Sequence, residues 1–499
     1  MMKKKILSLA VVMAMLLSFM PVIAQAATSG TCGANLTWTL DDNGTLTISG
    51  TGNMTDWSSP SYVPWYSSRD SIKDVIIGNS VTSIGKYAFA YCSSLKSVTI
   101  GNSVTSIGYG AFAYCSSLKS VVIPDSVESI GEGAFYECSS LESVTIGNSV
   151  TSIGGKAFYN CSSLGSGVIP DSVTSIGEWA FGDCSSLTSV VIPDSVTSIG
   201  YAAFYECSSL GSVVIPDSIE SIGEWAFAYC SSLERVVIPD RVTSIGTGAF
   251  YDCSSLESIS VDINNQYYSS ENGILFNKDK TTLIQYAIGK TDTQYTIPDS
   301  VTSIGDGAFS DCSSLESVTI GNSVESIGDC AFNYCSSLES VVIPDSVTSI
   351  GDWAFYQCSS LTDVYYGGSE NEWNAISIGG YNTPLTKATI HYNSTGIPSS
   401  LECHTEILNY SEIDGKYMIK STARNNTDTA ISCVMYSAVY SSDGTLKACG
   451  TVNENIDAGS NKEVNIPVPC TIETGDTIKT FMWADNMTPF AKAGELVIE

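Results

Sequence analysis

The sequence predicts a repeat solenoid that stacks a parallel β-sheet, followed by a small all-β sandwich. Cysteines recur every 23 residues from Cys92 to Cys253, and the same spacing resumes from Cys312 to Cys358. Apolar residues keep the same register in each unit, so one unit cannot bury them alone, but stacked units can. After residue 400 the repeat ends and short runs of alternating apolar residues replace it, which is typical of a sandwich.

Residues 1–26 are the predicted signal peptide. Lys3–Lys5 provide a basic start, Ile6–Val22 an apolar stretch, and Ala24–Ala26 a small-residue cleavage site. We expect cleavage and export to the cell surface or the medium. No membrane insertion is expected afterwards, because no later segment is apolar enough to span a bilayer.

Residues 27–72 are the predicted N-terminal cap. Apolar residues alternate over Leu36–Leu40 and again over Leu46–Ile48, with the turn signal Asp42–Gly44 between them. The aromatic segment Trp57–Trp65 follows. A solenoid needs its first open edge covered, so we interpret the hairpin and the aromatic segment as that cover.

Residues 73–392 hold about 11–12 units of 23 residues that approximate CSSLxSVxIPDSVTSIGxxAFxx. In the unit after Cys184, the inward positions are Leu187, Val190, Ile192, Val196, Ile199, Ala203 and Phe204. Alternation around Val190 predicts a short strand, and Pro193 begins a turn into a second inward segment. Phe204 belongs to a third side, which we expect to be a helical or 3₁₀ turn. The stack should therefore form about eleven parallel strands, with a wide surface and no enclosed pocket.

The unit between Cys253 and Cys312 is longer than the others by 36 residues. The apolar runs Ile274–Phe276 and Leu283–Ile284 flank a polar turn and predict a hairpin insertion over about 262–294. Such an insertion is either functional or a tolerated surface loop, and the sequence leaves both interpretations open.

The repeats are expected to end in a C-terminal cap at about 364–392, where Val364–Tyr366 begins the last strand. Residues 393–400 have the composition of a linker. Residues 401–499 are predicted to be an Ig-like sandwich of about seven strands. Its cysteines could form two bridges in any of three connectivities. They are Cys403, Cys433, Cys449 and Cys470.

Four segments occur in an order that resembles the BspA-like leucine-rich repeat proteins: the SVTSIGxxAFxxCSSLxSVxIP repeat, the front segment Gly30–Gly52, the insertion Asn264–Tyr286 and the rear cap. The resemblance covers about residues 30–392. It implies a right-handed leucine-rich repeat solenoid on an exported protein of bacteria or some protists. It also implies adhesion at cell surfaces to host proteins, matrix proteins or other cells, and it supplies no catalytic residue. The sandwich is only loosely similar to accessory domains of secreted Gram-positive proteins.

The acidic composition limits the classes of partner. Lys and Arg number 22 against 52 Asp and Glu, which corresponds to a formal net charge of −30. Such a surface repels phosphate backbones and anionic lipids unless a local basic patch offsets it. No such patch is visible in the sequence, so we expect no nucleic-acid partner.

Signals for catalysis and for cofactors are absent from the sequence. His391 and His404 are the only histidines, and none precedes His391 to act as a base for the many serines of the repeats. There is no phosphate loop, dinucleotide fingerprint or zinc spacing. Paired carboxylates stay open as a glycosidase signal, but an open solenoid face is a poor place to exclude water. We expect no enzyme activity, no cofactor and no metal site.

The cysteine column is predicted to hold buried thiols rather than disulfides. Neighbouring cysteines would lie one strand apart, but parallel side chains in register have poor geometry for an S–S bond. A buried thiol instead packs as a small apolar group. Cys330 lies off this register and is the residue that we most expect to be exposed and reactive.

Aspartates follow proline in four successive units, at Asp171, Asp194, Asp217 and Asp240. Stacked carboxylates could hold calcium. We favour capping of the turns through backbone N–H bonds, which the Asn at the same place in other units could also accept.

Two surfaces are candidates for ligand binding. The two residues after each Ile-Gly vary between units. There Trp179, Trp225 and Trp353 could anchor a protein or a sugar, with Tyr136, Tyr159, Tyr205 and Tyr251 nearby in register. Partial packing of these rings against the next unit is the alternative. The outward strand positions form an apolar ladder that either binds a partner or is small enough to be tolerated. Its members are Val122, Val191, Val214, Val237 and Val342.

The sequence therefore predicts a secreted or cell-surface protein. Its expected role is adhesion or protein–protein binding to host, matrix or neighbouring-cell ligands. The alternative is a carbohydrate or cell-wall module in the sandwich, using Trp483 or Tyr436, with the repeats as a stalk. The partner in either case is an extracellular protein or glycan.

Overall fold

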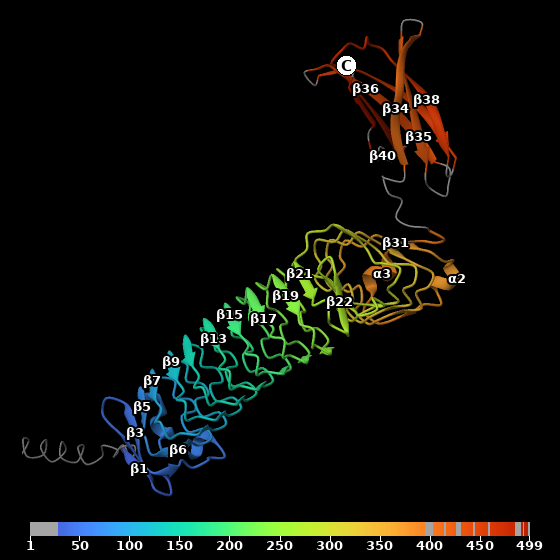
Figure 1. Cartoon of the computed structure of the whole chain (residues 1–499). Helices are drawn as coiled ribbons and strands as arrows, with labels where there is room; N and C mark the ends of the chain where they lie inside the picture. Colours follow the sequence, from blue (N-terminus) through green and yellow to red (C-terminus); the bar gives the residue numbers. More distant parts are fainter. Residues whose placement is uncertain are drawn as a thin grey trace, which may run out of the picture.

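The repeats form a solenoid whose turns each have three sides (Figure 1). The predicted signal peptide and most of the predicted linker lie outside the described residues. The computed structural model describes residues 28–394, 403–413, 416–425, 431–442, 445–457, 460–484, 491–492 and 494–497.

The first side carries fourteen short parallel strands, one from each turn. They are β5 (Asp74–Ile77), β7 (Ser97–Thr99), β9 (Ser120–Val122), β11 (Ser143–Thr145), β13 (Ser166–Val168), β15 (Ser189–Val191), β17 (Ser212–Val214), β19 (Arg235–Ile238), β21 (Ser258–Val261), β25 (Gln294–Thr296), β27 (Ser317–Thr319), β29 (Ser340–Ile343), β31 (Asp363–Tyr366) and β33 (Thr389–His391). The prediction of about eleven was low because β5, β25 and β33 belong to turns that have no column cysteine. The prediction that Val364–Tyr366 begins the last strand is wrong, because β33 follows β31 on this side.

The second side is another parallel ladder. Its strands are β4 (Gly52–Asn53), β6 (Val81–Ile84), β8 (Ser106–Ile107), β10 (Ser129–Ile130), β12 (Ser152–Ile153), β14 (Ser175–Ile176), β16 (Ser198–Ile199), β18 (Ser221–Ile222), β20 (Ser244–Ile245), β24 (Thr282–Gln285), β26 (Ser303–Ile304), β28 (Ser326–Ile327), β30 (Ser349–Ile350) and β32 (Ser377–Ile378). The long unit adds β22 (Tyr268–Glu271) and β23 (Ile274–Asn277). β23 pairs with β24 in the antiparallel hairpin that the two apolar runs predict.

The third side is a series of turns, not the predicted helical or 3₁₀ turn. Trp179 and Asp183 have positive φ values of 56° and 57°. The N–H groups of Trp179, Phe181 and Asp183 donate to carbonyls of the next unit at 2.9, 2.8 and 2.7 Å. A helix would direct these N–H groups to its own carbonyls. The left-handed residues direct them along the solenoid axis instead, where they join neighbouring units.

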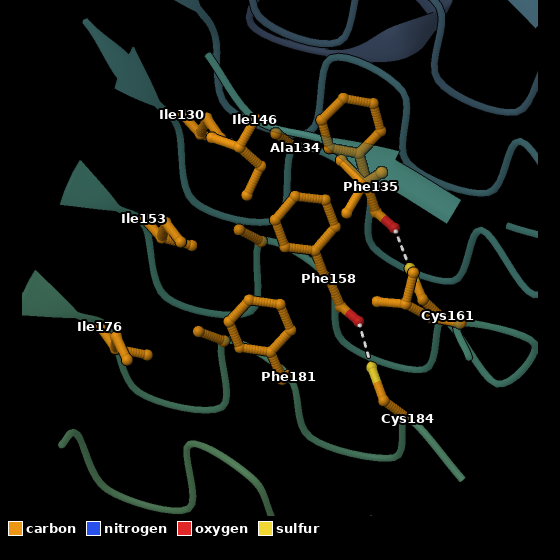
Figure 2. Packing of buried hydrophobic residues seen from close by; sticks show 14 of the residues in the cluster. Ile130, Ala134, Phe135, Ile146, Ile153, Phe158, Cys161, Ile176, Phe181 and Cys184 are labelled. Carbon is orange, nitrogen blue, oxygen red and sulfur yellow. Dashed lines mark hydrogen bonds between the residues drawn. The ribbon is translucent and has the colours of Figure 1, made fainter. Parts of the chain in front are cut away.

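Stacked phenylalanine rings and buried thiols fill the core between the three sides (Figure 2). The rings of Phe135 and Phe158 lie 5.3 Å apart and within 1° of parallel. Nine of these thiols each donate to a phenylalanine carbonyl of the preceding unit, as Cys184 Sγ does to Phe158 O at 3.2 Å. Burial raises the pKa of Cys184 to about 12, so the thiolate that oxidation requires is suppressed. All eleven column cysteines are buried free thiols, as the sequence predicts.

Aromatic residues close the N-terminal end. β1 (Ser29–Gly33), β2 (Leu36–Leu40) and β3 (Thr45–Gly50) form an antiparallel meander, and β3 pairs in parallel with β5. The 3₁₀ turns Pro60–Tyr62 and Tyr66–Ser71 follow. Trp65 stacks on Phe89 at 5.6 Å and its indole N–H donates to Ala88 O at 2.8 Å, so Trp65 occupies the position of the next phenylalanine in the stack.

Two short helices close the other end. α2 (Glu370–Trp373) begins with a capping box between Ser369 and Glu372, and α3 (Thr383–Lys387) buries Leu385. Among the described residues, no helix has the length and apolar character needed to cross a bilayer.

The described residues of the C-terminal region form two four-stranded sheets. One sheet contains β34 (Cys403–Ile413), β35 (Lys416–Asn425), β38 (Asn461–Val468) and β40 (Ala491–Lys492). The other contains β36 (Ile431–Tyr440), β37 (Leu446–Ile456), β39 (Thr477–Ala484) and β41 (Gly494–Val497). Ile466 from the first sheet and Met435 from the second share one buried cluster, which is the face-to-face packing of a sandwich.

Candidate functional site

Aromatic side chains form a continuous row along the third side, which we call the aromatic ladder. Eight successive units each contribute one ring, and neighbouring ring centroids lie between 4.5 and 5.7 Å apart. The rings are those of Tyr91, Tyr114, Tyr136, Tyr159, Trp179, Tyr205, Tyr229 and Tyr251. Aromatic pairs at this separation contribute about 0.5–1.5 kcal/mol beyond the burial of their area, so the ladder is held in place by its own contacts.

The ladder is continuous although no single position of the unit is always aromatic. The ring comes from the residue before the cysteine, as in Tyr114, or from the residue before that, as in Tyr136. In the unit of Cys184 the second of these positions is Gly182. The ring of Trp179 covers it, since a Cβ at Gly182 would lie 2.9 Å from a ring carbon of Trp179. The ring is thus retained while its position in the sequence changes.

The three predicted tryptophans are half-buried on this side. Trp179 contacts Tyr205 at 4.8 Å within the ladder, and Trp225 contacts Tyr251 at 5.1 Å. Trp353 lies beyond the insertion and stacks on Tyr381 at 3.9 Å. Packing against the next unit therefore occurs at all three, and part of each indole stays accessible.

Carboxylates border the ladder. Asp183, Glu206 and Asp252 occupy the residue before the cysteine and, with Asn160 and Tyr229, line a hollow of about 430 Å³. In this column the ladder ring of Tyr229 lies between Glu206 and Asp252. Rigid rings thus lie beside carboxylates on this surface, which suits a partner that presents cations beside apolar groups.

Burial and mutual repulsion raise the pKa values of part of this acidic row. Burial raises the pKa of Glu206, and its hydrogen bond to Asp183 raises it further. Burial raises the pKa of Asp252 to about 6, assisted by the negative charge of Asp311. Burial raises the pKa of Asp311 as well. A nearby cation would relieve this repulsion and lower these pKa values again.

Asp252→Asn is expected to stabilise the protein at pH 7.5 but not at pH 4. The folded state holds the Asp252 proton up to about pH 6, whereas an unfolded aspartate loses it near pH 3.9. The stability that the bound proton provides is therefore present below about pH 4 and lost as pH rises through about 6. Since Asp252 is half-exposed, solvent screening limits the gain to about 1 kcal/mol.

Urea denaturation of both proteins at pH 4 and pH 7.5 measures this effect. Asparagine tolerates the positive φ of 50° at position 252, so backbone strain is not added. The matched control is Asp171→Asn at an exposed turn, which should not change the pH dependence. An equal gain at both pH values in Asp252→Asn would contradict the assignment.

The outward valines form an exposed apolar ladder on the first side over part of its length. Val122, Val191, Val214 and Val237 are 63, 60, 69 and 58% exposed. Val342 is only 7% exposed, so its predicted outward exposure is wrong. Tyr365 lies beside Val342 on the next strand, and its ring stacks on His391 at 4.6 Å, so that aromatic groups occupy this end of the face.

Cys330 is partly exposed, but its surroundings oppose reactivity. Burial raises the pKa of the Cys330 thiol, and the carboxylates of Asp329, Asp306 and Asp352 raise it further. The reactive form of cysteine is the thiolate, which these negative charges disfavour.

The proline-following aspartates are exposed at Asp171, Asp194, Asp217 and Asp240. At the same position of other units, Asp125 and Asp299 each accept a backbone N–H of the next unit at 2.8 Å, from Asn148 and Asn322. Each of these bonds joins one turn to the same turn of the next unit. Within the part of the chain that the structure describes, no three His, Cys, Asp or Glu side chains gather into a group that could hold a metal ion.

In the sandwich, Tyr436 is half-buried on β36. The side chains of Trp483 and Cys403 lie outside the described residues. Cys449 and Cys470 are free thiols, so neither takes part in the bridges that the sequence predicts.

The predicted site residues omit the tyrosines and carboxylates directly before the cysteines. Their signal in the sequence is a column that holds only Tyr, Glu, Asp, Asn or Gln, at Tyr91, Tyr114, Glu137, Asn160, Asp183, Glu206, Tyr229, Asp252, Asp311, Tyr334 and Gln357. Restriction to large polar residues in a column that varies between units indicates a solvent-facing surface.

A model of the BspA type leucine rich repeat region matches the chain over residues 65–188, 180–286 and 281–405. These segments contain every turn of the solenoid from β5 to β33. No curated protein matches the sequence.

Solved structures of bacterial leucine-rich repeat proteins are also similar. One from Bacteroides ovatus is 26% identical, covers 72% of this chain and 98% of its own, and has a TM-score of 0.50. A leucine rich cell surface protein from Faecalibacterium prausnitzii is 28% identical, covers 71% and 98%, and has a TM-score of 0.39. The similarity to the Bacteroides ovatus protein is a similarity of the solenoid fold.

Proposed function

The chain belongs to the BspA-type leucine-rich repeat family, and we propose that it is a secreted or cell-surface protein that binds an extracellular protein through the aromatic ladder. One observation carries the proposal: eight successive units keep one ring in contact with the next, although the ring comes from three different positions of the unit. Core packing does not require this row, because the phenylalanine stack already fills the interior.

The ladder has the physical properties of a binding surface for a protein. Its rings are held by their neighbours, so that little side-chain entropy is lost when a partner covers them. Aromatic residues dominate the energetics of protein interfaces. The carboxylates of Asp183 and Glu206 beside Trp179 and Tyr205 favour partners with Arg or Lys at the contact.

Export and adhesion are parts of the same proposal. Export rests on the basic start, apolar stretch and cleavage signal of residues 1–26. Adhesion would follow where a protein partner with Arg or Lys at the contact is displayed on host cells, on the matrix or on neighbouring cells.

The test is binding of the purified protein, without residues 1–26, to immobilised matrix proteins, mucins and cell-wall glycans at physiological salt. Trp179→Ala with Tyr205→Ala is expected to weaken saturable protein binding at least tenfold, because it removes two adjacent anchors. Asp183→Asn with Glu206→Gln keeps the shape of the surface and should mainly slow association and reduce its salt dependence.

The matched control is Tyr267→Ala, which removes an aromatic ring that is 53% exposed on the insertion and should leave binding unchanged. Circular dichroism checks that each variant is folded. Protein binding that survives both ladder variants would overturn the proposal. Glycan binding without protein binding would do so as well, and would favour the sandwich as the working module.

A further inference from the structure

The first side of the solenoid has an uneven charge distribution that the sequence conceals. The residue before each strand is lysine in three successive turns, at Lys73, Lys96 and Lys119, and all three side chains are exposed. The pairing of β5 with β7 places Lys73 and Lys96 one strand apart, about 4.8 Å, and Lys119 lies before β9, the next strand of this side. A basic patch therefore exists in a protein of net charge −30, although none is visible along the sequence, because its members are 23 residues apart.

Farther along the same column the charge is reversed. Glu234 and Glu257 occupy this position before β19 and β21, and both are exposed. Glu257 makes a loose surface contact with Arg235 at 3.6 Å. Lys119 pairs with Glu142 at 3.0 Å, whereas Lys73 and Lys96 form no ion pair among the described residues.

The exposed valines lie between the two charged ends. Val191 and Val214 are 60 and 69% exposed and lie side by side on β15 and β17. A face with an apolar centre, a basic end and an acidic end is self-complementary, because the basic end of one copy can contact the acidic end of another.

We propose that a second copy of this chain covers this face, related by a two-fold axis parallel to the strands between β13 and β15. Such an axis reverses the order of the turns but leaves the position along each strand unchanged. The column of lysines in one copy must then face the column of glutamates in the other. Lys96 faces Glu257 of the second copy, Lys119 faces Glu234, and the valines meet at the centre.

The size of the contact makes the dimer weak. Eight strands, from β7 to β21, span about 34 Å along the axis, and each strand offers only three or four residues. An interface this narrow is at the lower end of specific interfaces. The aromatic ladders lie on a different side of each solenoid, so both stay free and the dimer is bivalent. The proposal does not rest on the identity of the ladder's partner.

Sedimentation equilibrium of the purified protein, without residues 1–26, tests the proposal over a range of concentrations at about 0.15 M salt. The unmodified protein should self-associate. Lys96→Glu with Lys119→Glu makes the column acidic at both ends, and Glu234→Lys with Glu257→Lys makes it basic at both ends. Each double variant alone should associate at least tenfold more weakly, and an equimolar mixture should restore dimers, because both ends of the interface are then complementary.

The matched control is Asp171→Lys with Asp194→Lys, which changes the net charge as much as Glu234→Lys with Glu257→Lys does, but at exposed turns outside the column. It should not restore association when it is mixed with the Lys96→Glu, Lys119→Glu variant. A monomeric unmodified protein at all concentrations overturns the proposal. If the mixture stays monomeric while the unmodified protein dimerises, the proposed pairing of lysines with glutamates between the two copies is wrong. Binding of heparin to the lysines of a protein that remains monomeric overturns it too, and assigns the column to a sulfated polymer.

Discussion

Phe204→Ala is expected to lower the free energy of unfolding of the central repeats by about 3–5 kcal/mol. Phe204 is fully buried. Its ring stacks between Phe181 at 5.5 Å and Phe227 at 5.4 Å, within 3° of parallel to each. Removing the ring leaves a cavity and breaks both contacts. The neighbouring units cannot close the gap, because their backbones are already joined along all three sides.

Urea denaturation followed by circular dichroism measures the loss. Hydrogen exchange of the central strands then shows that it is local, since a solenoid couples each unit mainly to its neighbours. The matched control is Tyr267→Ala, which deletes an exposed ring and should change stability by less than about 0.5 kcal/mol. Similar losses in both variants would show that the phenylalanine stack does not carry the stability assigned to it.

Gly200→Ala is the second substitution with a large expected effect, a loss of about 1–3 kcal/mol through overpacking. A Cβ at Gly200 would lie 2.8 Å from the carbonyl carbon of Gly177 and 2.8 Å from the oxygen of Ile176. Both are backbone atoms of the preceding unit and cannot rotate away. The two units would have to separate, which weakens the pairing of β14 with β16.

Gly211→Ala supplies the control for this effect within the next unit. A Cβ at Gly211 would meet its nearest atom at 4.0 Å, so the methyl group fits. The substitution also reduces the freedom of the unfolded chain, and we expect stability to stay equal or to rise by about 0.4–1 kcal/mol. Thermal and urea denaturation compare the two variants. A loss at Gly211 as large as that at Gly200 would contradict the close approach of the turns.

The core of the solenoid is predictable from the sequence because stacking repeats one contact many times. Once the period is 23 residues, Phe181, Phe204 and Phe227 must share a column, and their common apolar character places that column inside. The burial of the cysteines follows in the same way. The turns without a cysteine, such as that of β25, carry no such mark, so the expected number of strands was too low.

The candidate site is less predictable because it depends on contacts between columns. Trp179 is conspicuous in the sequence, but its contact with Tyr205 joins two different positions of the unit. That contact requires the left-handed turn of the third side and the space above Gly182. The burial of Val342 likewise depends on the size of Tyr365 in the following turn.

The sequence by itself determined the period, the inward residues of each turn and membership of each column, because residues one period apart must lie about one strand spacing apart in any stacked arrangement. The tertiary structure alone decided which columns touch, which rings join into the aromatic ladder, and that Lys96 and Glu257 lie on one exposed face. These relations depend on the directions in which the chain turns between its three sides, and the period carries no information about those directions.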